Sequence, residues 1–332
     1  MAGVTVTNQA AGKWRLPAEW EAHEATWIAW PHEKSDWPGK FAPIHWVYAD
    51  IVRHLAQVEV VRIVVQNEAE KKAAGRIFEK SGVDLDWVEF FIAPTNRSWL
   101  RDTSPIFVRN EAGEVAATDW KFNAWAKYPN FEHDDQLPAF VAKKLKMPRV
   151  ATKVVLEGGG IDSNGAGRLL TTEEWLLSDV QVRNPGFTRE DYQRVFAQHL
   201  GITEVIWLDH GIAGDDTHGH VDDLARFVAE DTVVTLDVGD AAARLKKAGL
   251  RVVKLPQPQP VTFDGQLLPA SYANFYIANG LVLVPTFTDP ADRLALSTLA
   301  KLFPDREVVG IPCRDLVLGL GTLHCMTMQQ PA

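Results

Sequence analysis

The sequence predicts an α/β protein built from a repeated unit in which a helix leads into a short strand. Three features predict it: segments with apolar residues at three- and four-residue spacing, β-branched segments that follow them, and polar loops with Gly or Asp after each strand. Several such units can form a doubly wound parallel sheet or close into a ring around a central site. Periodicity alone does not choose between these architectures.

Five of these units follow one another along the chain. We expect helices within 46–55, 76–82, 191–201, 241–250 and 296–305, and strands at 58–66, 88–94, 204–209, 251–256 and 306–312. No Ser/Gly linker, charge block or low-complexity segment separates the units. The 332 residues are long for one domain, but closed architectures often exceed the usual length. We therefore expect a single catalytic domain over residues 1–332.

Composition argues against several classes of protein. A net charge of -9 disfavours nucleic acid as a partner and is compatible with a cationic ligand. No apolar stretch reaches the roughly 18 residues of a membrane span, and residues 1–14 lack the pattern of a signal peptide. Two cysteines, Cys313 and Cys325, are too few for a disulfide framework. These features together predict a cytoplasmic protein with no nucleic acid or membrane partner.

Two polar clusters each accompany an expected strand. The segment NRSWLRDTSPIFV places Trp99, Arg101 and Asp102 just before a strand, where an Arg–Asp pair is most often a surface ion pair. In LEGGGID, Glu157 follows a strand and precedes three glycines. These glycines do not form a phosphate loop, because neither GxGxxG nor GxxxxGK[ST] is present. Glycine after a strand usually serves the geometry of a turn.

A third cluster, DDTHGHVDDLARF, is costly to bury without partners. Its His218, His220, Asp222 and neighbouring carboxylates have the ligand types of a divalent metal site. Alternatively, His220 and Asp222 lie two residues apart, so in a strand both would point to one face. That arrangement would place an imidazole acid/base beside a carboxylate that holds a cation. The cluster by itself leaves both possibilities open.

The fourth cluster, GLGTLHCMTMQQ, sets Cys325 beside His324 in a polar environment. Cys313, at the end of an expected strand, fits an inert buried thiol better. A thiol, an imidazole and three carboxylates (Asp102, Glu157 and Asp222) suit a planar cation, because a guanidinium offers paired N–H donors to carboxylates. Its carbon is a poor electrophile that needs a nucleophile as strong as thiolate.

At this point the chain resembles the agmatine deiminase / bacterial peptidylarginine deiminase family of the guanidino-group-modifying pentein superfamily. The likeness runs nearly end to end through ordered motifs: RLPAEWEAHEATWIAWPH, SWLRDTSP, WKFNAWAKY, EGGGID, GRLLTTEEWLL, GDDTHGHVDDLARF, ASYANFYIANGLVLVPTF and GLGTLHCMTMQQP. The resemblance implies a five-bladed α/β propeller with pseudo-fivefold symmetry and a site on its axis. It thereby favours the ring over the open sheet.

The resemblance also implies residue roles. Cys325 becomes the nucleophile and His220 the acid/base, Asp102 and Asp222 hold the guanidinium, and Glu157 is a partner of His220 or of the substrate nitrogens. Trp99 is expected against the aliphatic stem of the substrate, and Asn274 or Asn279 in the pocket. The chain departs from the family pattern at FNAWAKY, which lacks a Gly pair after the Trp, at Ser104, where Gly is common, and at Trp175, where Cys is frequent.

The expected reaction is hydrolysis of agmatine to N-carbamoylputrescine and ammonia through a Cys-bound thiouronium, without metal or organic cofactor. Four alternatives stay open at this stage: an arginine deiminase, a peptidylarginine deiminase, a metal-dependent hydrolase built on the Asp/His cluster, and a silent ligand-binding relative. An enzyme for free arginine should add a cationic contact for its carboxylate. A homodimer is the default expectation for such an enzyme.

Overall fold

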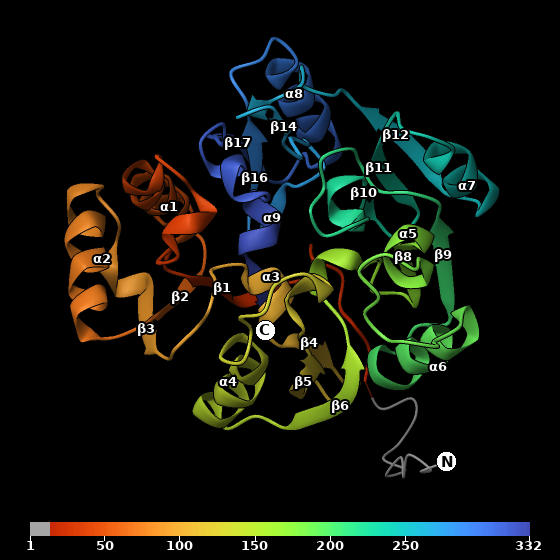
Figure 1. The fold of residues 1–332 in the computed structure, drawn as a ribbon, viewed down its shortest axis with the longest axis horizontal. Helices are drawn as coiled ribbons and strands as arrows, with labels where there is room; N and C mark the ends of the chain where they lie inside the picture. Colours follow the sequence, from red (N-terminus) through yellow and green to blue (C-terminus); the bar gives the residue numbers. More distant parts are fainter. Residues whose placement is uncertain (1–13) are drawn as a thin grey trace.

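Five small β-sheets stand around a common centre in the computed structural model, which describes residues 14–332 (Figure 1). Most of the helices lie on the outside of this ring, whereas the short helices α3 (Leu100–Thr103) and α9 (Leu323–Met326) lie near its middle. Residues 1–13, which belong to the segment without a signal-peptide pattern, lie outside the described residues. Within 14–332, no helix has the length and apolar character needed to cross a membrane.

All five sheets contain the same three-stranded motif, in which an antiparallel pair is followed by a parallel pair. The first sheet has the order β18-β1-β2-β3 and the others follow in chain order. The strands are β1 (His23–Ala29), β2 (Val60–Val65), β3 (Val88–Ile92), β4 (Ile106–Arg109), β5 (Val115–Lys121), β6 (Arg149–Val155), β7 (Asp162–Ser163), β8 (Arg168–Thr172), β9 (Glu204–Leu208), β10 (Ala225–Ala229), β11 (Thr232–Leu236), β12 (Arg251–Leu255), β15 (Tyr276–Ala278), β16 (Leu281–Thr286), β17 (Glu307–Pro312) and β18 (Met328–Pro331).

Each parallel connection carries a helix, because parallel neighbours need a long crossover. These helices are α1 (Phe41–Leu55), α2 (Glu68–Lys80), α4 (Leu137–Leu145), α5 (Glu173–Leu177), α6 (Arg189–Leu200), α7 (Ala241–Lys247) and α8 (Asp292–Leu302). Their ends follow local rules: Thr188 and Asp191 form a capping box at the start of α6, and Gly201 ends it at a φ of 68°. The repeated unit is therefore strand–strand–helix–strand.

The five expected helix–strand units are all present, but the way they are divided among the five sheets was not predicted. The units α1–β2 and α2–β3 both belong to the first sheet, whereas the unit α4–β6 of the second sheet was missed. Strand β6 has the sequence RVATKVV, and its residues alternate between exposed and half-buried. It therefore lacks the continuous apolar signal that identified the other strands.

The ring is closed by the last strand, which pairs with the first. Strand β18 runs antiparallel to β1, with Gln329 opposite Thr26 and Met328 opposite Trp27. The indole of Trp27 also donates to Oε1 of Gln330 at 2.9 Å. Because β18 begins three residues after Cys325, this closure fixes the segment that carries the thiol.

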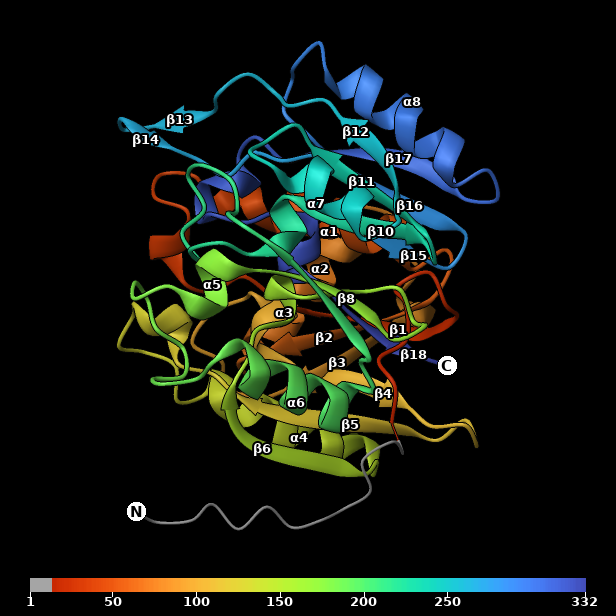
Figure 2. The same ribbon diagram turned by 90° about the vertical axis from the view of Figure 1, so that its right-hand side faces the viewer.

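A separate hairpin rises from the ring between β12 and β15 (Figure 2). It consists of β13 (Thr262–Phe263) and β14 (Gln266–Leu267), and its strands pair with each other in a two-stranded sheet. The turn residues Asp264 and Gly265 have φ values of 47° and 79°, as a tight two-residue hairpin turn requires.

Candidate active site

The expected site residues converge although they lie far apart in the sequence. Each is on a connection between consecutive sheets: Asp102 before β4, Glu157 between β6 and β7, His220 and Asp222 between β9 and β10, and Cys325 between β17 and β18. These connections pass near the centre of the ring, so one side chain from each can reach a common point. All five side chains are buried.

The fifth connection, between β12 and β15, contributes Asn274, whose side chain contacts the Cys325 thiol. Its Nδ2 is 3.1 Å from Sγ of Cys325 and 3.0 Å from Oδ1 of Asp223. Its Oδ1 accepts from Oγ1 of Thr322 at 2.7 Å and from the backbone N of His324 at 2.9 Å. Asn274 was expected as a substrate contact, but it does not line the cavity described below. Of the other expected site residues, Asp222, His220, Glu157 and Asn279 also lie outside this lining. These bonds fix the turn that carries Cys325.

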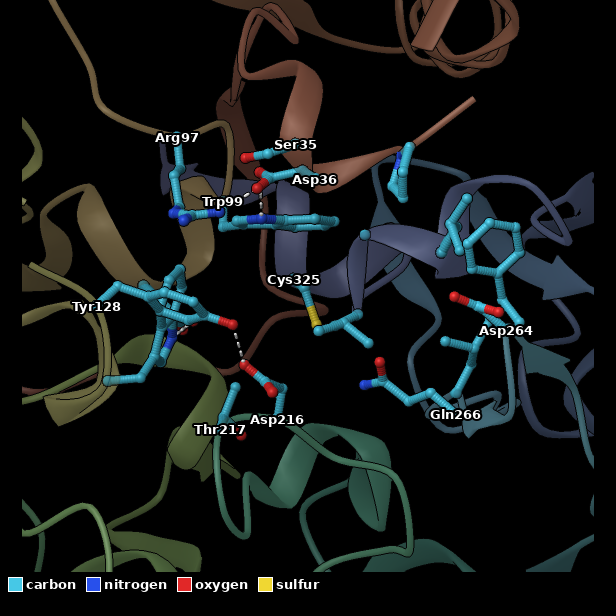
Figure 3. A pocket seen from close by; sticks show the side chains of 18 residues that line it. Ser35, Asp36, Arg97, Trp99, Tyr128, Asp216, Thr217, Asp264, Gln266 and Cys325 are labelled. Atoms are coloured by element: carbon cyan, nitrogen blue, oxygen red, sulfur yellow. Dashed lines mark hydrogen bonds and ion pairs between the residues drawn. The ribbon is translucent and has the colours of Figure 1, made fainter. Parts of the chain in front are cut away.

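A cavity of about 470 Å³ opens onto this centre (Figure 3). Cys325 and Asp102 line it together with the indoles of Trp99 and Trp125. The remaining lining residues come from several connections and from the β13–β14 hairpin: Ser35, Asp36, Pro38, Arg97, Tyr128, Asp216, Thr217, Phe263, Asp264, Gln266, Leu268, Leu318, Gly319 and Leu320. Trp99 therefore lies beside Cys325, as expected for a side chain that contacts the substrate stem.

Asp102 is held in place by two donors. Its Oδ2 accepts from Nε1 of Trp125 at 2.8 Å, and its Oδ1 accepts from the backbone N of Gly159 at 3.0 Å. Burial raises the pKa of Asp102 to about 6, although the nearby His220 acts in the opposite direction. No Lys or Arg of the described residues forms an ion pair with Asp102, so its charge is compensated less than that of Glu157.

Glu157 and His220 form a buried pair. Nε2 of His220 lies 3.5 Å from Oε2 of Glu157, whose Oε1 accepts from Nε of Arg183 at 3.0 Å. Burial opposes ionisation of Glu157, but Arg183 and His220 overcome it and lower its pKa to about 2. Burial likewise lowers the pKa of His220, but Asp102 and Glu157 outweigh it and raise that pKa to about 9. The imidazole is therefore protonated at neutral pH, as a proton donor must be.

Asp222 lies next to the thiol. Its Oδ2 is 3.6 Å from Sγ of Cys325 and 2.7 Å from Nδ1 of His324, while its buried Oδ1 has no hydrogen-bond partner within residues 14–332. The expectation that His220 and Asp222 share the face of a strand is wrong, because Val221–Asp223 forms a 3₁₀ turn. The two side chains nevertheless reach the same site, since both flank Gly159.

The glycine motif after Glu157 is explained by how closely the backbone approaches these groups. A Cβ atom on Gly159 would lie 2.6 Å from Nδ1 of His220, 3.0 Å from Oδ1 of Asp102 and 3.1 Å from Oδ2 of Asp222. One residue on, a Cβ on Gly160 would overlap the ring of Trp175. Both positions, Gly159 and Gly160, therefore require glycine because there is no room for a side chain.

The two cysteines occupy different environments. Burial raises the pKa of both thiols, but at Cys325 the carboxylates of Asp222, Asp223 and Asp102 raise it further. Cys313 is buried beside the end of β17 and does not line the cavity. Cys325 is thus a protonated thiol in the free protein, surrounded by groups that attract a cation.

The Asp/His cluster does not assemble the metal site that its sequence suggested. Asp215 organises its own loop by accepting from the backbone N atoms of Gly219 and His220, and His218 lies 3.1 Å from Oγ of Ser178. Within 14–332 the group with metal-ligand geometry is instead Asp222, Asp223 and Cys325, whose ligand atoms lie within 4.8 Å of one another. His220 is not part of it.

The chain is similar to known proteins over nearly its whole length. Residues 15–331 match the family described as Porphyromonas-type peptidyl-arginine deiminase. The chain belongs to this family. An agmatine deiminase of Ectopseudomonas mendocina is 34% identical over 100% of this chain and 99% of its own. The structure of an agmatine deiminase of Enterococcus faecalis is 30% identical, with 98% of both chains covered and a TM-score of 0.90. A putative arginine deiminase from Porphyromonas gingivalis is 33% identical, with 96% of this chain and 98% of its own covered and a TM-score of 0.84.

Two departures from the pattern of this deiminase family lie close to the site. At FNAWAKY, the three consecutive residues Ala124, Trp125 and Ala126 have φ values of 49°, 58° and 52°, which are unfavourable for residues with a Cβ. This turn aims the Trp125 indole at Asp102. Trp175 donates from Nε1 to Oε2 of Glu157 at 2.7 Å. Both departures therefore donate a hydrogen bond to an acidic group of the site. Ser104, the third departure, is buried and ends α3.

Sequence reasoning missed several supporting residues. Arg183, the ion-pair partner of Glu157, lies in a segment without a motif, so nothing in the sequence singled it out. The indoles of Trp125 and Trp175 were noted as departures but not as donors. His324 was noted as a polar neighbour of Cys325, yet its ring faces two carboxylates. The adjacency of His324 to the cysteine was the one available signal.

Proposed function

We propose that this chain hydrolyses agmatine to N-carbamoylputrescine and ammonia. The observation that carries the proposal is that the Cys325 thiol lies next to Asp222 and lines the same cavity as Asp102. Sγ lies 3.6 Å from Oδ2 of Asp222, and the Oδ1 atom of that buried carboxylate lacks a protein donor among the described residues. A guanidinium supplies N–H groups to such an oxygen, which brings its carbon to the thiol. The relatives from E. mendocina and E. faecalis, named for this activity, support the same substrate.

In the first step, Asp102 and Asp222 hold the guanidinium, whose positive charge favours ionisation of Cys325, and the thiol proton passes to solvent water. The thiolate forms a bond to the guanidinium carbon and gives a tetrahedral adduct. His220, protonated because of Asp102 and Glu157, gives its proton to a terminal nitrogen of this adduct. The C–N bond then breaks, ammonia leaves, and an S-alkylthiouronium remains on Cys325.

In the second step, His220 has become neutral and takes a proton from a water that attacks the thiouronium carbon. A second tetrahedral adduct collapses by breaking the C–S bond, and the proton of its hydroxyl group passes to the departing sulfur, which releases the ureido product and restores the Cys325 thiol. Glu157, fixed by Arg183, stabilises the imidazolium form of His220 at the end of each cycle. These steps use only side chains of this chain and water.

The charges of the cavity favour agmatine over free arginine. Its lining carboxylates are Asp36, Asp102, Asp216 and Asp264. Arg97 is the single cationic lining residue of the cavity within 14–332, and it is paired with Asp36 and lies over the ring of Tyr128. A substrate with an ammonium tail meets this acidic wall favourably, whereas the carboxylate of arginine would lack a free cationic partner.

The test is ammonia release from agmatine, free L-arginine and a blocked arginine peptide, using EDTA-treated protein and the Cys325→Ala variant in parallel. Turnover of agmatine alone, unchanged in EDTA and absent in the variant, is the expected outcome. Activity restored only by added metal would instead favour a metal-dependent hydrolase. Turnover of free L-arginine would identify arginine, rather than agmatine alone, as a substrate.

We also infer that the five sheets act as one catalytic domain in a reducing, cytoplasmic setting, which the two free cysteines support. The absence of a nucleic acid partner and the homodimer stay predictions. Gel-shift assays with single- and double-stranded DNA and light scattering of the full chain test them.

A further inference from the structure

We propose that His324 is a positioning residue for Asp222: as an imidazolium clamped between Asp222 and Glu19, it keeps Asp222 ionised and leaves one of its oxygens free for the guanidinium. This inference rests on the proposed function for the identity of the guanidinium. The arrangement of His324 itself does not depend on it.

The geometry places a carboxylate at each nitrogen of the His324 ring. Nδ1 lies 2.7 Å from Oδ2 of Asp222, and Nε2 lies 2.8 Å from Oε2 of Glu19. All three side chains are buried. An ionised carboxylate accepts hydrogen bonds and cannot donate them, so each contact needs an N–H on the ring. Two such contacts require both ring protons and hence a positive charge.

Both carboxylates have surroundings that keep them ionised. Glu19 accepts from NH2 of Arg226 and from the backbone N of Ile277, each at 2.8 Å. Although burial raises the pKa of Glu19, Arg226 and His324 bring it well below its usual value. Burial also raises the pKa of Asp222, but the hydrogen bond and charge of His324 reverse that shift and lower the pKa.

The consequence for Asp222 is a defined division between its two oxygens. Oδ2 is used by His324 and faces Sγ of Cys325, whereas Oδ1 is buried without a donor within 14–332. A buried carboxylate oxygen without a donor is costly unless a ligand supplies one. Burial raises the pKa of Asp222 and His324 is the largest influence that lowers it, so loss of the cation at His324 would favour a protonated Asp222, which binds a guanidinium poorly.

The backbone fixes the ring at this place. The N atom of His324 donates to Oδ1 of Asn274 at 2.9 Å, and its carbonyl oxygen accepts from Nε of Arg101 at 3.2 Å. His324 therefore cannot turn away without disturbing the turn that also carries Cys325. This explains why the nucleophile and the residue that prepares Asp222 are adjacent in the chain.

The cations around the site show a pattern consistent with this role. Glu157 has Arg183 as a permanent partner, and Asp222 has His324. Asp102 has the more distant His220, whose Nδ1 is 3.9 Å from its Oδ1. Of the three carboxylates, Asp102 has the most distant cationic partner, so its negative charge is the most available to a bound guanidinium. Asp222 already has His324 as a cationic partner before the substrate binds.

The first experiment compares the pH dependence of kcat/KM for agmatine in the wild type and in His324→Gln. The glutamine retains an amide donor but lacks the charge. We expect KM at pH 7 to rise more than about tenfold, because Asp222 becomes protonated in part of the molecules. We also expect the acid limb of the profile to move upward by about two pH units, because a tenfold loss at pH 7 requires about nine in ten molecules to carry a protonated Asp222.

His23→Gln is the matched control, because His23 is also a buried histidine beside a carboxylate. Its Nδ1 lies 3.2 Å from Oε1 of Glu59, and its Nε2 lies 2.7 Å from the carbonyl oxygen of Glu19. Its hydrogen bonds reach neither Asp222 nor a residue that lines the cavity, so its replacement should leave the acid limb in place. A loss in His324→Gln of equal factor at every pH, with KM unchanged, would show a merely structural role and overturn the proposal.

A double-mutant comparison tests whether His324 acts through Asp222. Calorimetry measures agmatine binding in four variants that all carry Cys325→Ala: alone, with Asp222→Asn, with His324→Gln, and with both. We expect the His324 replacement to cost less than about threefold in affinity once Asp222 is neutral. Full additivity of the two losses would contradict the proposal.

A third measurement is made on the wild-type protein, so it depends neither on catalytic turnover nor on the correct folding of a variant. Nitrogen NMR of histidine-labelled wild type, with His324 assigned through its backbone, should show both ring nitrogens protonated at pH 7.5. A ring with one bare nitrogen would overturn the proposal. If agmatine is not turned over while the ring proves doubly protonated, the proposed substrate fails and the clamp stands.

Discussion

Sγ of Cys325 lies 3.6 Å from Oδ2 of Asp222, so the nucleophile and a guanidinium-binding carboxylate are direct neighbours. Burial and the nearby carboxylates raise the pKa of the thiol well above its usual value. A thiol that faces anions becomes reactive only when a cation reduces their field. The first prediction follows from this relationship.

Alkylation of the free protein by iodoacetamide should be slow at pH 7.5 and should still increase with pH above 9. Mass spectrometry of the labelled peptide measures the rate at Cys325. Cys325→Ala should abolish turnover and retain the melting temperature, whereas Cys313→Ser should be near neutral. A fast, pH-independent reaction of Cys325 between pH 6 and 8 would argue for a thiolate already present without substrate.

The pH profile of kcat/KM should have two limbs. Asp102 must be ionised to bind the guanidinium, so activity should fall as pH decreases through about 6. His220 must carry a proton for the leaving nitrogen, so activity should fall as pH rises through about 9. Initial rates at low agmatine concentration between pH 5 and 10 measure both limbs. A profile that is flat from pH 5 to 7 would contradict the role given to Asp102.

Replacement of Asp102 by Asn should weaken transition-state binding by about 2–5 kcal/mol, because a buried guanidinium loses its charged partner. The shape of the side chain is kept, so the bond from Trp125 can persist. Steady-state kinetics give the loss, and calorimetry of agmatine binding separates affinity from chemistry. An effect below tenfold in kcat/KM would mean that Asp102 does not contact the substrate.

Gly159→Ala should remove activity while the fold survives. The added methyl group would enter the space between His220 and Asp102 and displace the groups that hold the substrate. Gly75→Ala in α2 is a control for the general effect of replacing a glycine, since a Cβ there meets nothing within 4 Å and the backbone does not have a positive φ. The kinetics and melting temperatures of both variants decide, and a Gly159→Ala variant with wild-type kcat/KM would refute the packing argument.

Asp264→Asn should raise KM for agmatine about two- to fivefold, as expected for an exposed charge pair. Asp36 and Asp216 are already paired with Arg97 and Lys127, which leaves Asp264 as the lining carboxylate without an ion pair among the described residues. Shorter guanidines without an ammonium tail should be unaffected by the change. Equal losses for both types of substrate would place the effect elsewhere.

Much of this molecule could be predicted from local patterns. The helix–strand units were visible because their apolar residues recur at regular spacing, and the motifs around Asp102, Glu157, His220 and Cys325 marked the site. The unit α4–β6 was not visible, since Ala, Thr and Lys interrupt the apolar residues of its strand RVATKVV.

Contacts between distant segments could not be predicted. Arg183 supports Glu157 across a loop, and His324 reaches Glu19 from the other end of the chain. The 3₁₀ turn at Val221–Asp223 rules out the shared strand face considered for His220 and Asp222, because a two-residue spacing by itself does not distinguish a strand from a turn. The ring itself followed from the family resemblance, because periodicity did not distinguish it from an open sheet.

The pairing of β18 with β1 has a further consequence, because the position of the Cys325 thiol depends on whether the ring is closed. Any event that detaches Met328–Pro331 from His23–Ala29 also draws Cys325 away from Asp222 and Asn274. Separation of β18 from β1 would abolish activity before the other four sheets unfold. Loss of turnover on heating should therefore precede loss of secondary structure.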